Sequence, residues 1–359
     1  MADPTPSSRR QLLSGLVKPQ GSEAAASQAR VAPAGSSTVR LTARCMACDF
    51  SVIMNPGSSD RITPAGEALE LVGAVESWLS LYRSDSELSL VNQNAGLAAV
   101  RIRPEFQRLI RLALELTKRT NGGFDLAMGA LTLLWKRCRR EERLPLENEI
   151  TEALSACGSA HVEFDEAAET VRLKRPGNTL DPGAIGKGFA LDEAASFLRK
   201  QPDAPEEFLL HGGHSSVLAV GGHNSHAGWP IGLGNPLFTE KRLATVLLQN
   251  QAMGTSGSNI QFFRYQGRRY GHILDPQTGW PAEGMLSVTV LAPSAAVADA
   301  LSTAFFAMGV ERTMECLSAW PEIGAILVPF PEAGRKVRPV VAGIPSDQIF
   351  WDEDQAEVR

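Results

Sequence analysis

A chain of 359 residues is long enough to bury one large hydrophobic core or two smaller ones. Its formal net charge of -5 and the lack of a long basic run argue against a nucleic-acid-binding protein. No stretch approaches the roughly 20 consecutive apolar residues that a transmembrane helix needs. The composition therefore favours a soluble globular protein whose partners are small molecules or other proteins.

The five cysteines are scattered along the chain, and an odd number is not typical of a disulfide framework. Cys45 and Cys48 have the C-x-x-C spacing, but no second pair follows that would complete a zinc site. Both lie in an alternating, strand-like run. We therefore interpret them as two small apolar residues of a strand.

Residues 1–37 are rich in Ala, Ser, Pro, Gly and Gln and lack hydrophobic periodicity, so we expect them to be disordered. The segment 8–13 (Ser-Arg-Arg-Gln-Leu-Leu) resembles a twin-arginine export signal, but Lys18 interrupts the apolar region that should follow. Two interpretations stay open. The segment is either a degenerate export or docking tag, which favours an extracytoplasmic or membrane-associated protein, or a chance resemblance in a cytoplasmic one.

Two helices are predicted in the first half of the chain. One opens at Pro64 and the other at Pro104, because proline is tolerated in the first turn of a helix. The second helix is expected to end at residues 121–123, Asn-Gly-Gly. The charged run at residues 136–143 is interpreted as a solvated surface loop.

Short apolar or alternating runs bounded by turn residues predict strands. They cover residues 38–54, 161–173, 208–220, 229–233, 243–248, 260–265, 286–291 and 325–329. Helices and strands do not alternate one for one, which favours an α+β fold with mainly antiparallel strands over a parallel doubly wound sheet. We predict one domain over residues 38–350, followed by a tail at 351–359.

Residues 254–258 (Gly-Thr-Ser-Gly-Ser) are interpreted as a turn that cradles a phosphate, because closely spaced Gly and Ser let backbone N–H groups converge on an anion. The helix-like run 294–303 then carries Asp299 and Thr303 on one face. A lone carboxylate in so apolar a helix is costly without partners. A carboxylate one turn from a hydroxyl suits a hard cation such as Mg²⁺. We therefore predict metal-assisted chemistry on a phosphate ester or pyrophosphate.

Several short motifs follow one another along the chain. They are 82–92 (YRSDSELSLVN), 122–125 (GGFD), 181–192 (DPGAIGKGFALD), 212–213 (GG), 254–257 (GTSG), 272–279 (HILDPQTG) and 299–303 (DALST). Each alone is a weak signal, but together and in this order they resemble the FAD:protein FMN transferase family, also called ApbE-like. The resemblance covers about residues 44–343 and implies an α+β, ApbE-like (T-fold-like) architecture of mainly antiparallel strands packed against helices.

Members of that family use Mg²⁺ to split FAD at its pyrophosphate and transfer FMN to a Thr or Ser hydroxyl of a target protein, with AMP leaving. The resemblance implies Mg²⁺ as cofactor, FAD as substrate and an acceptor protein as partner, such as a subunit of an electron-transfer or ion-pumping complex. Two rival functions stay open. With water as the acceptor, the protein would be an FAD pyrophosphatase that yields FMN and AMP. A non-catalytic FAD-binding protein would not need the predicted metal pair, which argues against it.

The resemblance also assigns site residues. The implied metal ligands are Ala184, through its carbonyl, and Asp299, Ser302 and Thr303. The residues implied to line the flavin nucleotide site are Met46, Tyr82, Gly123, Phe124, Asp125, Asp181, Lys187 and Ile273. His272 matches the histidine that assists proton removal from the acceptor hydroxyl, and its titration near neutral pH suits a general base. Asp275 either orients His272 or caps the turn, and we favour the cap.

Four histidines form two H-x-x-H pairs in a Gly-rich region: His211, His214, His223 and His226. This spacing raises a zinc hypothesis. We disfavour it because family members do not need such a cluster. Within the implied metal loop, Pro182 fixes φ and removes a donor, and Gly186 stands where family members often carry Ala.

Overall fold

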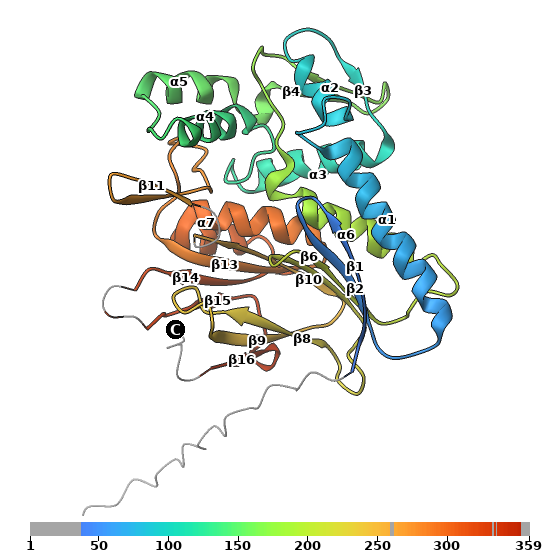
Figure 1. Cartoon of the computed structure of the whole chain (residues 1–359). Helices are drawn as coiled ribbons and strands as arrows, with labels where there is room; N and C mark the ends of the chain where they lie inside the picture. The colour runs from blue at the N-terminus through green and yellow to red at the C-terminus, as the bar shows by residue number, and fades with distance from the viewer. Residues whose placement is uncertain (1–36, 259–261, 332–333, 335, 353–359) are drawn as a thin grey trace, which may run out of the picture. The chain divides into compact units, whose positions relative to one another are not determined.

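The computed structural model describes residues 37–258, 262–331, 334 and 336–352 (Figure 1). They belong to a single compact unit. The twin-arginine-like segment and the stretch 1–36 expected to be disordered lie outside the described residues. None of the described helices is long and apolar enough to cross a membrane.

An eight-stranded sheet in the order β1-β2-β6-β7-β10-β13-β14-β15 forms the centre of the domain. Its strands are β1 (Val39–Cys45), β2 (Cys48–Met54), β6 (Phe208–Gly212), β7 (Ser216–Val220), β10 (Gln251–Gly257), β13 (Met285–Ala292), β14 (Gly324–Pro329) and β15 (Val340–Ala342). Every neighbouring pair in it is antiparallel. The predicted α+β fold with mainly antiparallel strands is confirmed.

Three helices pack on one face of this sheet: α1 (Ile62–Leu79), α6 (Gly186–Leu198) and α7 (Ala295–Leu317) (Figure 1). Helix α7 lies on β10 and β13 and kinks at Gly309, where φ is 73°. The opposite face carries a three-stranded sheet in the order β16-β9-β8. Its strands are β8 (Trp229–Gly234), β9 (Arg242–Leu248) and β16 (Ile349–Trp351).

The central strands are apolar on both faces because each face supports its own core. Leu210 and Ala252 contribute to the core under the helices, whereas their neighbours Leu209 and Met253 contribute to the core against the small sheet. Side chains alternate across a strand, so consecutive apolar residues fill both cores. This double burial explains the nearly continuous hydrophobic runs of the strands.

The remaining elements lie around the helical layer (Figure 1). The helices are α2 (Glu87–Gln93), α3 (Pro104–Arg119), α4 (Gly129–Arg140) and α5 (Glu147–Ala156). The strands are β3 (Val100–Arg101), β4 (Val162–Asp165), β5 (Thr170–Leu173), β11 (Phe262–Tyr265) and β12 (Arg268–Gly271). Short 3-10 turns occupy η1 (Ser59–Arg61), η2 (Ser159–His161), η3 (Pro182–Ala184) and η4 (Ser346–Gln348). Both predicted helices are present: α3 begins at Pro104 as expected, and α1 begins at Ile62, two residues before Pro64.

Three runs predicted as single strands are hairpins instead. Residues 38–54, 161–173 and 208–220 each fold into two paired strands. In the first, Met46 and Ala47 form the turn with φ of 49° and 61°. The sequence lacks the Asn-Gly or Asp-Gly pair that normally marks such a turn. The alternating pattern therefore predicted one continuous strand across it.

The predicted phosphate-cradling turn at 254–258 is wrong, because Gln251–Gly257 is strand β10, paired with β7 and β13. The small residues have another cause. A Cβ on Gly254 would lie only 2.5 Å from the carbonyl carbon of Ala298. Glycine therefore lets α7 approach β10 closely enough to place its side chains beside the strand.

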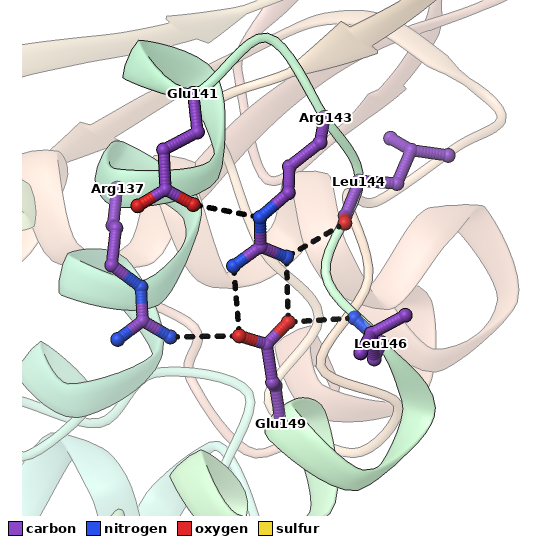
Figure 2. A network of polar contacts seen from close by, with 6 residues as sticks. All are labelled: Arg137, Glu141, Arg143, Leu144, Leu146 and Glu149. Carbon is purple, nitrogen blue, oxygen red and sulfur yellow. Dashed lines mark hydrogen bonds and ion pairs between the residues drawn. The ribbon is translucent and has the colours of Figure 1, made fainter.

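The predicted surface loop at 136–143 is also wrong, because α4 continues to Arg140. Leu131, Leu134, Trp135 and Cys138 are buried at helical spacing beneath a charged, exposed face. The chain turns only after this helix. There, the Arg143 guanidinium bonds both carboxylate oxygens of Glu149, at 2.7 and 2.8 Å (Figure 2).

Candidate active site

A pocket of about 460 Å³ opens beside α7, and most of the predicted site residues line it. Those that do are Gly123, Phe124, Asp125, Asp181, Ala184, Lys187, His272, Ile273, Asp299, Ser302 and Thr303. Met46 and Tyr82 do not line it. Met46 lies in the β1–β2 turn and packs against the main core, whereas Tyr82 is 89% exposed, its ring 5.9 Å from the Lys136 ammonium.

Asp299 is the buried carboxylate of this pocket, with 7% of its surface exposed. The backbone N–H of Gly188 donates to its Oδ2 at 2.8 Å, and the Ser216 hydroxyl donates at 2.7 and 2.8 Å. Burial raises the pKa of Asp299 to about 6, while the nearby Lys187 ammonium and these two donors oppose the rise. The carboxylate is therefore held in place by dedicated partners.

Three hydroxyl groups besides that of Ser216 lie in this corner, and two of them bond Asp299. Those of Ser302 and Thr303 donate to the Asp299 carbonyl at 2.9 and 3.3 Å. The Ser256 hydroxyl, from β10, lies 2.9 Å from that of Ser302 and 3.1 Å from that of Thr303. This oxygen-rich corner exists because α7 packs so closely on Gly254 of the same strand. A carboxylate and several hydroxyl oxygens form a donor set that fits a hard cation such as Mg²⁺.

Lys187 lies in the first turn of α6 and hydrogen-bonds the Ser215 hydroxyl. The Ser215 hydroxyl lies 3.4 Å from that of Ser216, which bonds Asp299. The α6 and α7 backbones pack closely here. A Cβ on Gly188 would lie only 2.1 Å from the Ala295 carbonyl oxygen. The structure thus brings a cation and a carboxylate from two helices to one side of the pocket.

Two other predicted carboxylates shape the loops of the pocket. Asp181 accepts the N–H of Gly183 at 2.9 Å and caps η3. Asp125 accepts the N–H groups of Ala127 and Ser159, both at 2.8 Å, and the Ser159 hydroxyl. Both side chains reach the pocket while fixing the backbone beside it.

His272 follows β12 and lines the pocket next to Ile273. Asp275 accepts the N–H of Gln277 at 2.8 Å, so the predicted turn cap is confirmed. The histidines considered for zinc lie elsewhere. His223 stacks on Trp229 with ring centroids 4.7 Å apart, and the described residues contain no cluster of three or more His, Cys, Asp or Glu side chains suited to a metal.

An aromatic wall of the pocket was not predicted from the sequence. Phe263 stacks on Tyr270 with ring centroids 5.4 Å apart, and Trp135 of α4 lies 6.2 Å from Tyr270. Lys136 and Arg139, from the same helix, also line the pocket. The helical spacing of the buried residues in α4 could have indicated this wall. It was not recognised because residues 136–143 were interpreted as a surface loop.

Comparison with known proteins identifies the family to which this chain belongs. The model of the ApbE family matches residues 41–327. The FAD:protein FMN transferase of Treponema pallidum is 33% identical over 280 residues, covering 74% of this chain and 76% of that protein. That of Klebsiella pneumoniae is 32% identical over 268 residues, covering 74% and 81%.

Solved structures agree with these matches. The ApbE protein of Thermotoga maritima superposes with a TM-score of 0.75 at 28% identity, covering 82% of this chain and 94% of that one. The flavin transferase ApbE of Vibrio cholerae gives a TM-score of 0.72 at 26% identity, covering 85% and 97%. With its helices, antiparallel sheet and oxygen-lined pocket arranged as described above, the chain belongs to the ApbE family.

Proposed function

We propose that this protein transfers FMN from FAD to a Thr or Ser hydroxyl of an acceptor protein and releases AMP. The observation that carries the proposal is the buried Asp299 carboxylate, held beside hydroxyl groups and Lys187 in one pocket. Burying a carboxylate is costly, and a protein that only binds FAD would not need it as a metal ligand. Relatives that share the family are named FAD:protein FMN transferases.

The residues that would hold Mg²⁺ are Asp299, Ser302, Thr303 and the carbonyl of Ala184. All four line the pocket, and oxygen atoms are the ligands that this ion prefers. When bound, Mg²⁺ supplies Lewis-acid stabilisation of the negative charge on pyrophosphate oxygens.

The chain's own groups have separate roles in the transfer. The acceptor oxygen forms a bond to the phosphorus on the FMN side, the bond from that phosphorus to the bridging oxygen breaks, and the bridging oxygen leaves with AMP. Lys187 neutralises phosphate charge as the bond breaks. His272 takes the proton of the acceptor hydroxyl as a general base.

The rest of the pocket binds the nucleotide. Gly123, Phe124, Asp125 and Ile273 line it, and Asp181 fixes the loop that carries Ala184. Trp135, Phe263 and Tyr270 offer apolar aromatic surface for the ring system of a ligand. Met46 and Tyr82 lie outside the pocket lining, and we propose that they contact the part of FAD that extends beyond it.

The test combines purified protein, FAD and Mg²⁺ with and without a threonine-bearing acceptor domain. AMP release is followed by chromatography, and covalent flavin on the acceptor by its fluorescence after denaturing electrophoresis. We expect acceptor-dependent labelling that is lost in Asp299→Ala and after chelation of the metal. Release of AMP and FMN without labelling would instead identify an FAD pyrophosphatase. Tight FAD binding without AMP release under any divalent metal would overturn the enzyme assignment.

A further inference from the structure

A second cavity, of about 250 Å³, lies between the central sheet and the small sheet that contains β8 and β9 (Figure 1). We name it the inter-sheet cavity. Thr255 is the one described residue that lines both this cavity and the pocket beside α7. The neighbours of Thr255 on β10, Gly254 and Ser256, face α7. Because side chains alternate across a strand, the two cavities lie on opposite faces of the central sheet.

Most of the side chains that line the inter-sheet cavity are apolar. They include Val217, Met253, Ile326 and Val328 of the central sheet and Ile231 and Leu233 of β8. All six belong to the hydrophobic core between the two sheets. A void in such a core forfeits packing contacts, which an apolar group of a ligand would restore.

Several lining groups are polar and only partly bonded. Among the described residues, no hydrogen bond is made by the His211 ring. Burial and the charges of Arg40 and His214 lower its pKa to about 4, so at neutral pH the ring is uncharged and can donate one N–H. Thr255 and Thr289 are cross-strand partners with hydroxyls 2.9 Å apart. One of their two O–H protons is not used between them, so this cavity offers donors to a ligand.

Two arginines flank the inter-sheet cavity. Arg40 donates to the hydroxyl of Ser51, the cross-strand partner of His211, at 2.9 Å. The guanidinium of Arg242 lies against the cavity lining, because a Cβ on Gly232 would be 2.9 Å from its Nε. In the part of the chain that the structure describes, neither arginine forms an ion pair. Unpaired cations beside these donors favour a ligand with a negative charge.

We propose that the inter-sheet cavity binds a small amphipathic monocarboxylate, with its carboxylate at His211 and its apolar tail against the core side chains. The charge of Arg40 attracts the carboxylate, and the Thr255–Thr289 pair supplies a second donor. At about 30 Å³ per water, the cavity volume equals roughly eight waters, which suits a molecule the size of octanoate. The site is separate from the nucleotide pocket and does not depend on the proposed transferase function.

The head and the tail of the ligand can be tested separately. Each buried methylene contributes about 0.8 kcal/mol, or about fourfold in affinity, so hexanoate should bind roughly fifteenfold more weakly than octanoate. Octanamide, which has no charge, should bind at least about tenfold more weakly. Octylammonium should not bind. Calorimetric titration of the full chain with each compound gives the dissociation constants.

Three variants locate the site. His211→Leu should weaken octanoate binding about ten- to hundredfold, the cost of a lost hydrogen bond to a charged group. Arg40→Gln should weaken it about two- to fivefold, as expected for an exposed charge. Arg44→Gln is the matched control and should have no effect. Arg44 is exposed and lies on the same face of β1, but it pairs with Asp49 at 3.6 Å. Near-UV circular dichroism checks that each variant is folded.

Nuclear magnetic resonance identifies the group that octanoate contacts. The chain has six histidines, so the resonances of labelled His211 can be assigned by comparison with His211→Leu. We expect octanoate to shift the His211 resonances of the wild type, with and without FAD, in the absence of divalent metal.

Four outcomes would overturn the proposal. The first is no binding of octanoate to the wild type, which would leave only water as the occupant of the cavity. The second is octanoate binding that neither His211→Leu nor Arg40→Gln weakens. The third is equal binding of octylammonium, because the site would then not select a negative charge. The fourth is displacement of octanoate by FAD, which would place it in the nucleotide pocket.

Discussion

The hydroxyl of Ser216 lies 2.7 Å from Oδ1 and 2.8 Å from Oδ2 of Asp299, so one side chain of β7 serves both oxygens of the predicted metal ligand. The N–H of Gly188 also donates to Oδ2, at 2.8 Å. These contacts fix the orientation of the buried Asp299 carboxylate. Ser216 is therefore a positioning residue for the site, contributed by the sheet.

Replacement of Ser216 by Ala should weaken metal binding about tenfold to a hundredfold, as is typical when a group that orients a metal ligand is lost. It should also lower the free energy of unfolding of the metal-free protein by about 1–3 kcal/mol, because a buried carboxylate loses a donor. Metal titration by calorimetry and urea unfolding measure the two effects. Ser51→Ala is the control, since Ser51 is an equally buried serine of the sheet that bonds Arg40. Equal metal affinity in both variants would contradict the positioning role.

His272→Ala should reduce kcat for flavin transfer by about 10²–10⁴-fold, the usual contribution of a general base. Binding of FAD should change little, because the proton of the acceptor hydroxyl is removed only during transfer. Stopped-flow transfer rates and the Kd for FAD separate the two quantities. A loss confined to FAD affinity would show that His272 binds the nucleotide and is not the base.

Gly254→Ala should destabilise the domain by about 3 kcal/mol, because the new Cβ would press against the α7 backbone at Ala298. Gly257→Ala on the same strand is the matched comparison, since its Cβ would meet nothing closer than 3.6 Å. Urea unfolding of both variants checks the difference. If the two substitutions cost the same, close contact between β10 and α7 is not what requires glycine.

His211 makes stability depend on pH. Burial, with Arg40 and His214 nearby, lowers its pKa from 6.5 to about 4. Its neutral form therefore contributes stability above about pH 6.5 that is lost as pH falls through about 4, up to about 3 kcal/mol. The raised pKa of Asp299 acts in the opposite direction over part of this range, so the comparison must be with wild type. Between about pH 7.5 and about pH 4.5, His211→Gln should lose less unfolding free energy than wild type. Equal losses would contradict this assignment.

The sequence predicted the parts of the fold that local patterns encode. Pro104 and the apolar stripe behind it located α3, and the short apolar runs located most strands of the sheets. The hairpin at Met46 and Ala47 was missed because its turn residues carry no local signal for positive φ. Gly254 was misread because a glycine that admits a neighbouring helix looks the same as one that forms a turn.

The site residues likewise include some that local sequence patterns predicted and some that they did not. Asp299 stood out because a carboxylate is rare in so apolar a helix, and Thr303 followed from helical spacing. Ser216 gave no signal, since serine is common and its partner lies 83 positions away. Lys136 and Arg139 of the pocket lining were not predicted for a different reason. The charges of α4 resemble a solvated loop until the buried residues between them are recognised as one helix face.

The partners of Asp299 have one further consequence. Its oxygens are bonded by residues 83 and 111 positions away, from a strand and a second helix. A fragment that lacks either element also lacks a partner of this carboxylate, so under the proposed function the metal should bind only the complete domain. By mass action, such a ligand stabilises the native state as a whole. Under the proposed function, supply of the metal should therefore govern how long the protein survives proteolysis as well as how fast it works.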